Sequence, residues 1–421
     1  MSTGLPARKA ALAIVSGVLR QRRALDFQLE GLKSLEPRDA GFARALASQT
    51  LRHLGLLDAV LREFLEKPLQ PHKAGAAHEI LLLGTCELLI LKVAAHAAVD
   101  AANQLAAQDK KAVHFKPLIN AVLRRMSRDG WSVLPKLDAP KLCTPDWLWA
   151  GWAKQYGEAA AREIARAHLH EAPVDIVLNE GEAPDSEALF GNVRRLIGQG
   201  RIEDLPGFAE GGWWVQDAAA TLPVQLLGDV AGKTVIDLCA APGGKTMQLA
   251  AQGAKVTAVE IDATRALRIR ENLARTRLSA EIAQCDARDF DRTAPLVLID
   301  APCTATGTIR RHPDLPWIKG AADVTVSAAA AYEILEAGAA MVEPGGTLVF
   351  AVCSLERSEG EEQIAAFLSA HPEFVRVPVT ADELFGHTEW ITPEGDLRTL
   401  PCHLSDKGGM DGFYAARLRR L

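Results

Sequence analysis

The sequence predicts a multidomain protein with an all-α domain at residues 1–133, a small α+β module at 134–208 and a doubly wound α/β domain at 209–421. Three observations lead to this division. Apolar residues recur at helical spacing through the first 130 residues, a proline-containing stretch at 131–145 interrupts that pattern, and short apolar strands alternate with longer helices from residue 233 onward. The length of 421 residues suits about three domains of ordinary size.

The first domain is rich in Leu and Ala, and stripes such as Ala43, Leu46, Ala47 and Leu51 follow the spacing of an amphipathic helix. Residues 1–140 hold 20 basic and 13 acidic residues, a net charge of +7. Residues 141–421 hold 27 and 40, a net charge of −13, so the whole-chain charge of −6 hides a basic front end. Basic clusters at 20–23, 110–111 and 124–128 favour an RNA partner, although each cluster alone fits a solvated helix face.

The middle module is expected to begin with a helix that carries Trp147, Trp149 and Trp152. These rings could stack on bases, but a buried helical face is at least as good an interpretation. A strand is predicted at 174–179, a helix at 187–198 and a short extended segment at 201–205.

Neither a leader peptide nor a membrane span is predicted. The apolar stretch at 10–19 has helical spacing and is followed by arginines, and the most apolar window, 80–99, is interrupted by Glu87 and Lys92. The seven cysteines include no CxxC pair, so we expect reduced thiols, no metal site and a cytoplasmic protein. The oligomeric state stays open, with a monomer as the expectation.

The third domain is expected to form a largely parallel sheet. Strands are predicted at 234–238, 255–261, 280–284, 296–300 and 347–353, with helices from 245, up to 277, and at 321–342 and 359–370. In such sheets ligands bind at the carboxyl ends of the strands. Functional residues are therefore sought in the turns that follow the strands.

The first of these turns resembles a phosphate-binding loop, but Cys239 stands where that loop requires glycine. Small residues there still allow a ligand to approach the backbone, and Asp237 adds an acceptor. Glu260 follows the second strand and Asp286 the third, at positions suited to a ribose diol and an adenine. One such acid is usually a surface residue, but three at successive strand ends favour a cofactor that contains a nucleoside.

Two cysteines also follow strands. Cys303 comes after the strand that ends at Asp300, and Cys353 ends a later strand, so both should reach the same crevice. A thiolate there could act as a nucleophile. The run at 310–314, Arg-Arg-His-Pro-Asp, could hold a phosphate backbone or lower the pKa of a thiol.

These motifs together resemble a known family. The turn at 237–246, the Asp-Ala-Pro-Cys turn at 300–303, the 310–314 run, the Cys-Ser pair at 353–354 and the segment at 411–416 are similar to the NOL1/NOP2/Sun family of S-adenosylmethionine-dependent RNA cytosine-C5 methyltransferases. Residues 5–130 resemble the NusB-like RNA-binding domain. The resemblance implies a Rossmann-like class I methyltransferase domain, and the fusion is typical of bacterial enzymes of the Sun type that act on 16S rRNA.

The resemblance implies a role for each site residue. Cys353 looks like the nucleophile that adds to cytosine C6, Cys303 looks like the cysteine that assists product release, and Asp300 would stabilise the activated pyrimidine. The expected S-adenosylmethionine-binding residues are Cys239, Ala240, Ala241, Pro242, Gly243, Gly244, Lys245, Glu260, Asp286 and Asp300. Because a duplex hides C6, the target base must be unpaired or flipped out.

The chain departs from the family pattern at two places. Val352 stands where Thr is usual before the nucleophile, and Thr304-Ala305 replaces the common Ser-Gly after Cys303. We expect these changes to tune activity, since both cysteines and Asp300 are present. Two alternatives stay open beside 16S rRNA methylation: the same chemistry on tRNA, and a catalytically silent RNA-binding factor in ribosome assembly.

Overall fold

The computed structural model describes residues 4–198 and 200–421, which form two compact units. Unit 1 is Met1–Glu171 with Ile309–Gly320, and unit 2 is Ala172–Thr308 with Ala321–Leu421. The predicted domain boundaries at 133/134 and 208/209 stay predictions. None of the helices in the described residues is long and apolar enough to cross a membrane.

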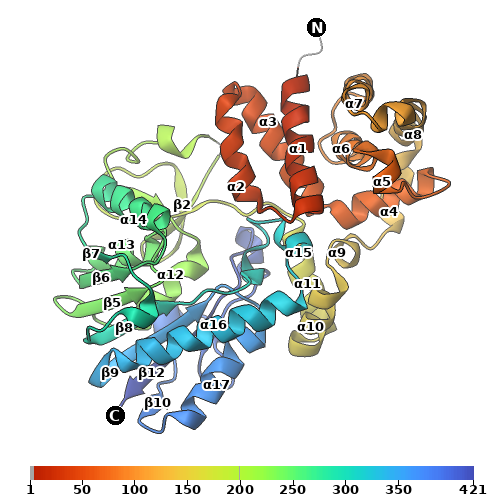
Figure 1. The fold of residues 1–421 in the computed structure, drawn as a ribbon. Helices are drawn as coiled ribbons and strands as arrows, with labels where there is room; N and C mark the ends of the chain where they lie inside the picture. Colours follow the sequence, from red (N-terminus) through yellow and green to blue (C-terminus); the bar gives the residue numbers. More distant parts are fainter. Residues whose placement is uncertain (1–3, 199) are drawn as a thin grey trace. The chain divides into compact units, whose positions relative to one another are not determined.

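Unit 1 is helical (Figure 1). Its helices are α1 (Leu5–Gln21), α2 (Leu25–Leu29), α3 (Pro37–Arg52), α4 (Leu54–Phe64), α5 (Pro71–Ala74), α6 (Ala77–Leu89), α7 (Ala95–Gln108), α8 (Lys116–Asp129), α9 (Ala139–Leu142), α10 (Asp146–Tyr156), α11 (Glu158–His168) and α15 (Leu315–Ile318). The predicted stripes form one apolar core, in which Leu46 and Leu51 of α3 are completely buried. Trp149 and Trp152 of α10 are also buried, so the interpretation as a packed helical face is the correct one for these two rings.

The segment Ile309–Gly320 belongs to unit 1 although its neighbours in sequence belong to unit 2. Its Asp314 accepts a hydrogen bond from the backbone N–H of Leu25 at 2.8 Å, and Trp317 donates to the carbonyl of Leu51 at 2.9 Å. Arg310 is 1% exposed. The expectation that Arg310 would meet RNA or a thiol is therefore wrong, because its side chain is buried inside the protein.

Unit 2 begins with an antiparallel sheet in the strand order β2-β3-β1-β4. Its strands are β1 (Asp175–Leu178), β2 (Ser186–Phe190), β3 (Val193–Leu196) and β4 (Trp213–Val215). β1 confirms the first predicted strand, but the helix expected at 187–198 is wrong, since these residues form the β2–β3 hairpin. The chain turns at Gly191, which has φ +52°, and Arg195 of β3 is buried in an ion pair with Asp175 at 2.7 Å.

The large sheet of unit 2 has the strand order β10-β12-β9-β8-β5-β6-β7, with β11 paired to β12. β7, β6, β5, β8 and β9 are parallel, whereas β12 is antiparallel to its neighbours β9, β10 and β11. The strands are β5 (Thr234–Leu238), β6 (Lys255–Val259), β7 (Glu281–Ala283), β8 (Ala294–Asp300), β9 (Val342–Val352), β10 (Phe374–Arg376), β11 (Leu397–Arg398) and β12 (Tyr414–Arg420). The prediction of a largely parallel sheet is confirmed.

Helices cover both faces of this sheet (Figure 1). Along β8, Leu296 and Leu298 face one apolar layer while Val297 and Ile299 face the other, as the period of two in a strand requires. One layer includes α12 (Ala218–Gln225), α13 (Gly244–Ala251) and α14 (Ala263–Thr276), and the other α16 (Ala321–Ala340) and α17 (Glu361–Ala370). The strand order reverses direction at β5, which lies between β6 and β8 and so marks the point where such sheets bind ligands.

Candidate functional site

A pocket of about 420 Å³ opens at the carboxyl ends of β5, β6, β7, β8 and β9. It brings together seven of the predicted site residues, which come from five different turns: Cys239, Ala241, Glu260, Asp286, Asp300, Cys303 and Cys353. The other predicted residues, Ala240, Pro242, Gly243, Gly244 and Lys245, lie in the same first turn but outside the lining of the pocket. The volume falls in the usual range for small-molecule sites.

The turn after β5 is tightly coiled. Cys239 has φ +59° and Gly243 has φ +102°, and Gly243 is the N-cap residue that precedes helix α13. A side chain at Gly243 would be strained by this left-handed conformation, which explains glycine at that position. Burial raises the pKa of the Cys239 thiol to about 12, so this cysteine is a neutral lining group and no nucleophile.

Glu260 and Asp286 occupy the next two strand ends. Glu260 is almost completely buried, and its carboxylate accepts hydrogen bonds from the backbone N–H groups of Ala241 at 3.3 Å and Asp262 at 3.1 Å. Asp286 pairs with Arg288 at 2.6 Å, and this guanidinium lowers the pKa of the Asp286 carboxyl. Both acids thus lie on the wall of the pocket with their side chains held by hydrogen bonds.

Asp300 forms an ion pair that the sequence did not reveal. The Nζ atom of Lys245 donates to Asp300 Oδ2 at 2.7 Å, and only 7% of the Lys245 side chain is exposed. Lys245 also lies over the ring of Phe413, 5.1 Å from its centroid. The pair joins the start of α13 to the end of β8, so the first turn fixes the position of a carboxylate in the pocket.

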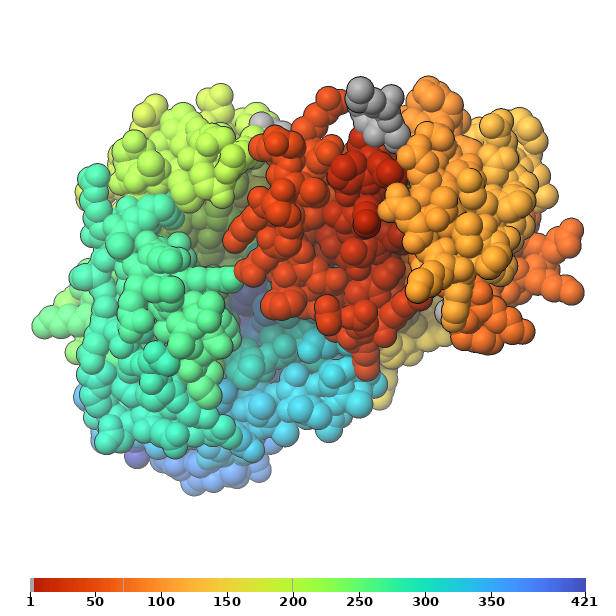
Figure 2. Space-filling view, turned by 45° about the horizontal axis from the view of Figure 1, so that its top comes forward, coloured from red at the N-terminus to blue at the C-terminus, as the bar shows by residue number. Residues whose placement is uncertain are grey.

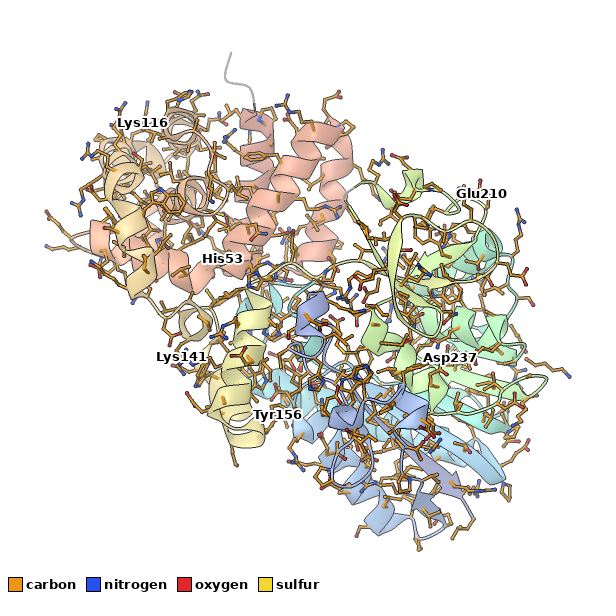
Figure 3. All side chains as sticks on the ribbon, turned by 180° about the vertical axis from the view of Figure 1, so that it is seen from behind. His53, Lys116, Lys141, Tyr156, Glu210 and Asp237 are labelled. Carbon is orange, nitrogen blue, oxygen red and sulfur yellow. The ribbon has the colours of Figure 1, made fainter. Side chains whose placement is uncertain are left out.

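Asp237 lies on β5, within the sheet of unit 2 (Figure 3), and is not among the residues that line the pocket. It is completely buried on β5, and Thr246 Oγ1 donates to its Oδ2 at 2.5 Å. Burial raises its pKa to about 7, against an opposing effect of the Thr246 hydrogen bond. Asp237 therefore acts from beneath the turn and does not line the pocket.

The two candidate catalytic cysteines are in contact. The Sγ atoms of Cys303 and Cys353 lie 3.5 Å apart, and both side chains are partly exposed to the pocket. The contact with Cys353, together with burial, raises the pKa of the Cys303 thiol well above its usual range. Cys303 is therefore a neutral thiol that can exchange a proton, which differs from what a nucleophile requires.

A buried carboxylate lies beneath the two cysteine turns. Glu359 is fully buried and accepts hydrogen bonds from Thr304 N at 2.8 Å, from Thr304 Oγ1 at 2.6 Å and from Ser354 Oγ. Glu359 was not among the predicted site residues, because it stands six positions after Cys353, where the sequence predicts the start of a polar helix. Only the folded chain brings it between the two turns.

The two departures from the family pattern have different surroundings. Ala305 has φ +58°, a left-handed conformation that glycine adopts without strain. Val352 is completely buried at the end of β9, opposite Tyr414 of β12, so its side chain contributes to the core. A strained turn and a lost hydroxyl are the two local consequences.

The surface of unit 1 carries the predicted basic clusters. The segment that holds helices α7 and α8, in light orange, presents a broad surface in the space-filling view (Figure 2). Arg124, Arg125 and Arg128 of α8 are exposed, and Lys116 at the start of α8 lies on the outside of unit 1 (Figure 3). Arg20 differs from this expectation, since it pairs with Glu79 at 2.5 Å.

A groove of about 670 Å³ lies between the segment after α4 and α8 of unit 1; we call it the α4–α8 groove. Its walls combine the apolar side chains of Phe115 and Leu118 with the cations of Lys67, Lys73 and Arg125. Lys67 and Lys73 have no carboxylate partner within residues 4–198 and 200–421. The groove therefore offers a positive, partly apolar surface.

Comparison with known proteins gives matches along nearly the whole chain. The model of the 16S rRNA methyltransferase RsmB/F family matches residues 224–419, and that of the NusB family matches residues 5–128. Proteins named ribosomal RNA small subunit methyltransferase B are 33% identical in Serratia proteamaculans over 98% of both chains, and 34% identical in Pseudomonas putida over 100% of this chain and 99% of the relative. These matches confirm the predicted family resemblance.

Solved structures agree on the fold. The crystal structure of PH0851 aligns with 98% of both chains at a TM-score of 0.75 and 22% identity. NSun6 from Pyrococcus horikoshii aligns with 66% of this chain and 98% of its own at a TM-score of 0.55 and 17% identity. At these identities the likeness concerns the fold alone, and it confirms the predicted helical and α/β architecture.

Proposed function

Because the chain belongs to the 16S rRNA methyltransferase RsmB/F family, with full-length relatives named ribosomal RNA small subunit methyltransferase B, we propose that it methylates small-subunit rRNA at cytosine C5 with S-adenosylmethionine. One observation carries this proposal: the strand-end acids and both cysteines line the same pocket. The reaction belongs in the cytoplasm, where the rRNA substrate is made.

The pocket fits S-adenosylmethionine. Glu260, Asp286 and Asp300 offer carboxylate oxygens at three strand ends, and Val259, Ile261 and Ala301 offer apolar contacts between them. In our proposal Glu260 holds the ribose, Asp286 lies at the adenine, and residues 239–245 surround the methionine part. When bound, S-adenosylmethionine supplies a methyl group activated by a sulfonium.

In this proposal the two thiols activate the pyrimidine and release the product. Cytosine C5 is a weak nucleophile, so the Cys353 thiolate first forms a bond to C6, and the electron pair of the C5–C6 double bond makes C5 reactive. After C5 has gained the methyl group, its proton passes to water, the C5–H electron pair restores the double bond, and the S–C6 bond breaks. Cys303, a neutral thiol 3.5 Å from Cys353, is placed to assist this release by donating its proton to the departing Cys353 sulfur, and it regains a proton from water.

In this proposal Asp300 contacts the target base. Its Oδ2 atom is held by Lys245 at 2.7 Å, while 30% of its side chain is exposed. A carboxylate fixed in this way can accept a hydrogen bond from the N4 amino group or from a protonated N3 of cytosine. Lys245 thus positions Asp300 and is not itself a catalytic group.

The RNA-contacting surface that we propose includes the α4–α8 groove. Its three cations, Lys67, Lys73 and Arg125, match the negative charge of a phosphate backbone, and its apolar floor can contact an unstacked base. The net charge of +7 over residues 1–140 supports the same assignment. The triple variant Lys67→Gln, Lys73→Gln, Arg125→Gln, called the groove variant below, removes these charges.

Transfer of labelled methyl groups to 16S rRNA tests the proposal. The wild type should label a cytosine of 16S rRNA, Cys353→Ala should be inactive, and Cys303→Ala should accumulate a protein–RNA adduct that survives denaturant. Cys402→Ala is a matched control outside the pocket and should behave as wild type. Full activity of Cys353→Ala would refute the nucleophile, label in tRNA alone would refute the substrate, and no label in any RNA would refute the enzyme.

A further inference from the structure

Glu359 joins the two turns that carry the cysteines. Its Oε1 atom accepts from the N–H of Thr304, the residue after Cys303. Its Oε2 atom accepts from Thr304 Oγ1 and from Ser354 Oγ, and Ser354 is the residue after Cys353. One carboxylate therefore holds both thiol-bearing turns through the residue adjacent to each thiol.

Further hydrogen bonds link the same two turns, and together with those of Glu359 they form the set that we call the Glu359 bracket. Thr306 Oγ1 lies 3.2 Å from Ser354 Oγ and accepts from Leu355 N at 3.0 Å. The backbone N–H of Gly307 donates to the carbonyl of Cys353 at 3.0 Å. All of these donors and acceptors belong to the 303–308 turn or to the 353–359 turn, so these hydrogen bonds hold the two turns together.

A buried carboxylate is costly unless hydrogen bonds satisfy it, and charge-assisted bonds of this kind are short and strong. The donors described here satisfy both oxygens of Glu359, which is completely buried and takes no part in lining the pocket. An apolar residue in its place would leave Thr304 N and two hydroxyl groups without their acceptor. Simple packing is thus a poor explanation for an acid at this position.

We propose that Glu359 is a positioning residue that sets the distance and orientation of Cys303 relative to Cys353, so that both thiols reach one pyrimidine. The inference deepens the proposed function and rests on it. Neighbouring Glu361 has a different part: it pairs with Arg398 at 2.7 Å, and Arg398 donates to the Ser354 carbonyl. Glu361 therefore reaches only one of the two turns.

Electrostatics adds a second effect of the same residue. The contact with Cys353 and burial are the main reasons why the pKa of Cys303 is raised, and the negative charge of Glu359 raises it further. Glu359 should therefore help to keep Cys303 protonated. This gives the bracket a measurable signature that a purely structural residue would lack.

The test compares three variants. Glu359→Gln keeps the size of the side chain and removes the charge, and Glu359→Asp keeps the charge and shortens the reach. Glu362→Gln is the matched control, an exposed acid three residues further on, in helix α17. Three properties are measured: kcat and KM with 16S rRNA, the covalent adduct on denaturing gels, and the pH profile of Cys303 alkylation by iodoacetamide, read by mass spectrometry.

We expect both Glu359 variants to lose kcat by roughly 10²-fold with little change in KM for RNA, since a displacement of about 1 Å at reacting groups has an effect of that size. Glu359→Gln should also accumulate adduct and shift Cys303 alkylation to lower pH, while Glu359→Asp should keep the wild-type pH profile. Glu362→Gln should match the wild type in every measurement.

Two results would overturn the inference. The first is a Glu359→Gln enzyme whose kcat, adduct level and alkylation profile all match those of the Glu362→Gln control. The second is a loss of kcat together with a lowered Tm and an unchanged alkylation profile, which would show that Glu359 only stabilises the fold. Failure of the proposed function is distinguishable, because alkylation needs no RNA. A wild type that methylates no RNA, combined with a shifted profile in Glu359→Gln, would refute the function and keep the bracket.

Discussion

Replacement of Asp237 by asparagine should flatten the pH dependence of the stability of unit 2. Burial raises the pKa of Asp237 from 3.8 to about 7, so the folded state favours the protonated form more than the unfolded chain does. The stability that this protonation contributes is complete below pH 3.8 and is lost as the pH rises to about 7. Asparagine cannot titrate, and it can still accept the hydrogen bond from Thr246.

The size of the effect follows from the two pKa values. A difference of about 3 pKa units corresponds to about 4 kcal/mol over the whole range, of which about 3 kcal/mol lies between pH 5 and pH 8. The wild type should therefore lose about that much more free energy of unfolding than Asp237→Asn over this interval. The comparison cancels the other titrating groups, which both proteins share.

Methionine oxidation across a urea gradient measures the free energy of unfolding of unit 2 separately from that of unit 1. Met247 and Met410 are buried in unit 2, and Met126 in unit 1 is an internal reference; mass spectrometry of each peptide gives its unfolding midpoint at pH 5 and pH 8. Asp229→Asn, an exposed change in the same unit, is the control and should follow the wild type. Parallel wild-type and Asp237→Asn curves at Met247 would refute the reasoning.

Three further predictions concern the turns and the groove. Gly307→Ala should destabilise unit 2 by about 1–3 kcal/mol and reduce methylation, because a Cβ at this position would lie 1.9 Å from the Gly412 carbonyl oxygen. Calorimetry compares this variant with the control Gly41→Ala, whose added Cβ would meet open space. Equal Tm values for the two variants would contradict the prediction. Ala305→Gly should keep activity and change the free energy of unfolding by less than about 1 kcal/mol. The reason is that glycine relieves the strain of the left-handed conformation but also increases the conformational entropy of the unfolded chain. A larger loss of stability in urea unfolding would show that the Ala305 methyl group is needed. The groove variant should bind single-stranded 16S rRNA fragments with a weaker dependence on salt: the slope of log K against log salt concentration should fall by about 2, since each of the three lost phosphate contacts contributes about 0.7. An unchanged slope in filter binding would show that the groove is not part of the RNA-binding surface.

Most of the large sheet was predictable because each strand is a short apolar run with its own turn signals. β5 matches its predicted range, and the predicted strands at 255–261 and 296–300 differ from β6 and β8 by two residues at one end. Parallel strands that are buried on both faces tolerate few polar residues, so the pattern is strong. The position of Glu260 and Asp300 at strand ends followed directly from it.

The β2–β3 hairpin was missed because its pattern is not apolar. Strand β3 reads Val-Arg-Arg-Leu, and the buried Arg195 looks like a surface residue until Asp175 on β1 neutralises it. The same reason explains the error at Arg310, whose charge suggested solvent although its side chain is buried. Buried charges deceive sequence analysis because their partners are far away along the chain.

The sequence by itself determined the chemical groups of this protein and the strand ends at which they stand: the acids, the two cysteines and the basic front end. Only the tertiary structure decided which groups meet, as with Lys245 and Asp300, or with Cys303 and Cys353 at 3.5 Å. The physical reason is that periodicity reports burial within one element, whereas a hydrogen bond between turns depends on the register of several strands. Glu359 illustrates this most clearly, since the sequence shows an acid at a helix start and the fold makes it the acceptor that holds both thiol turns.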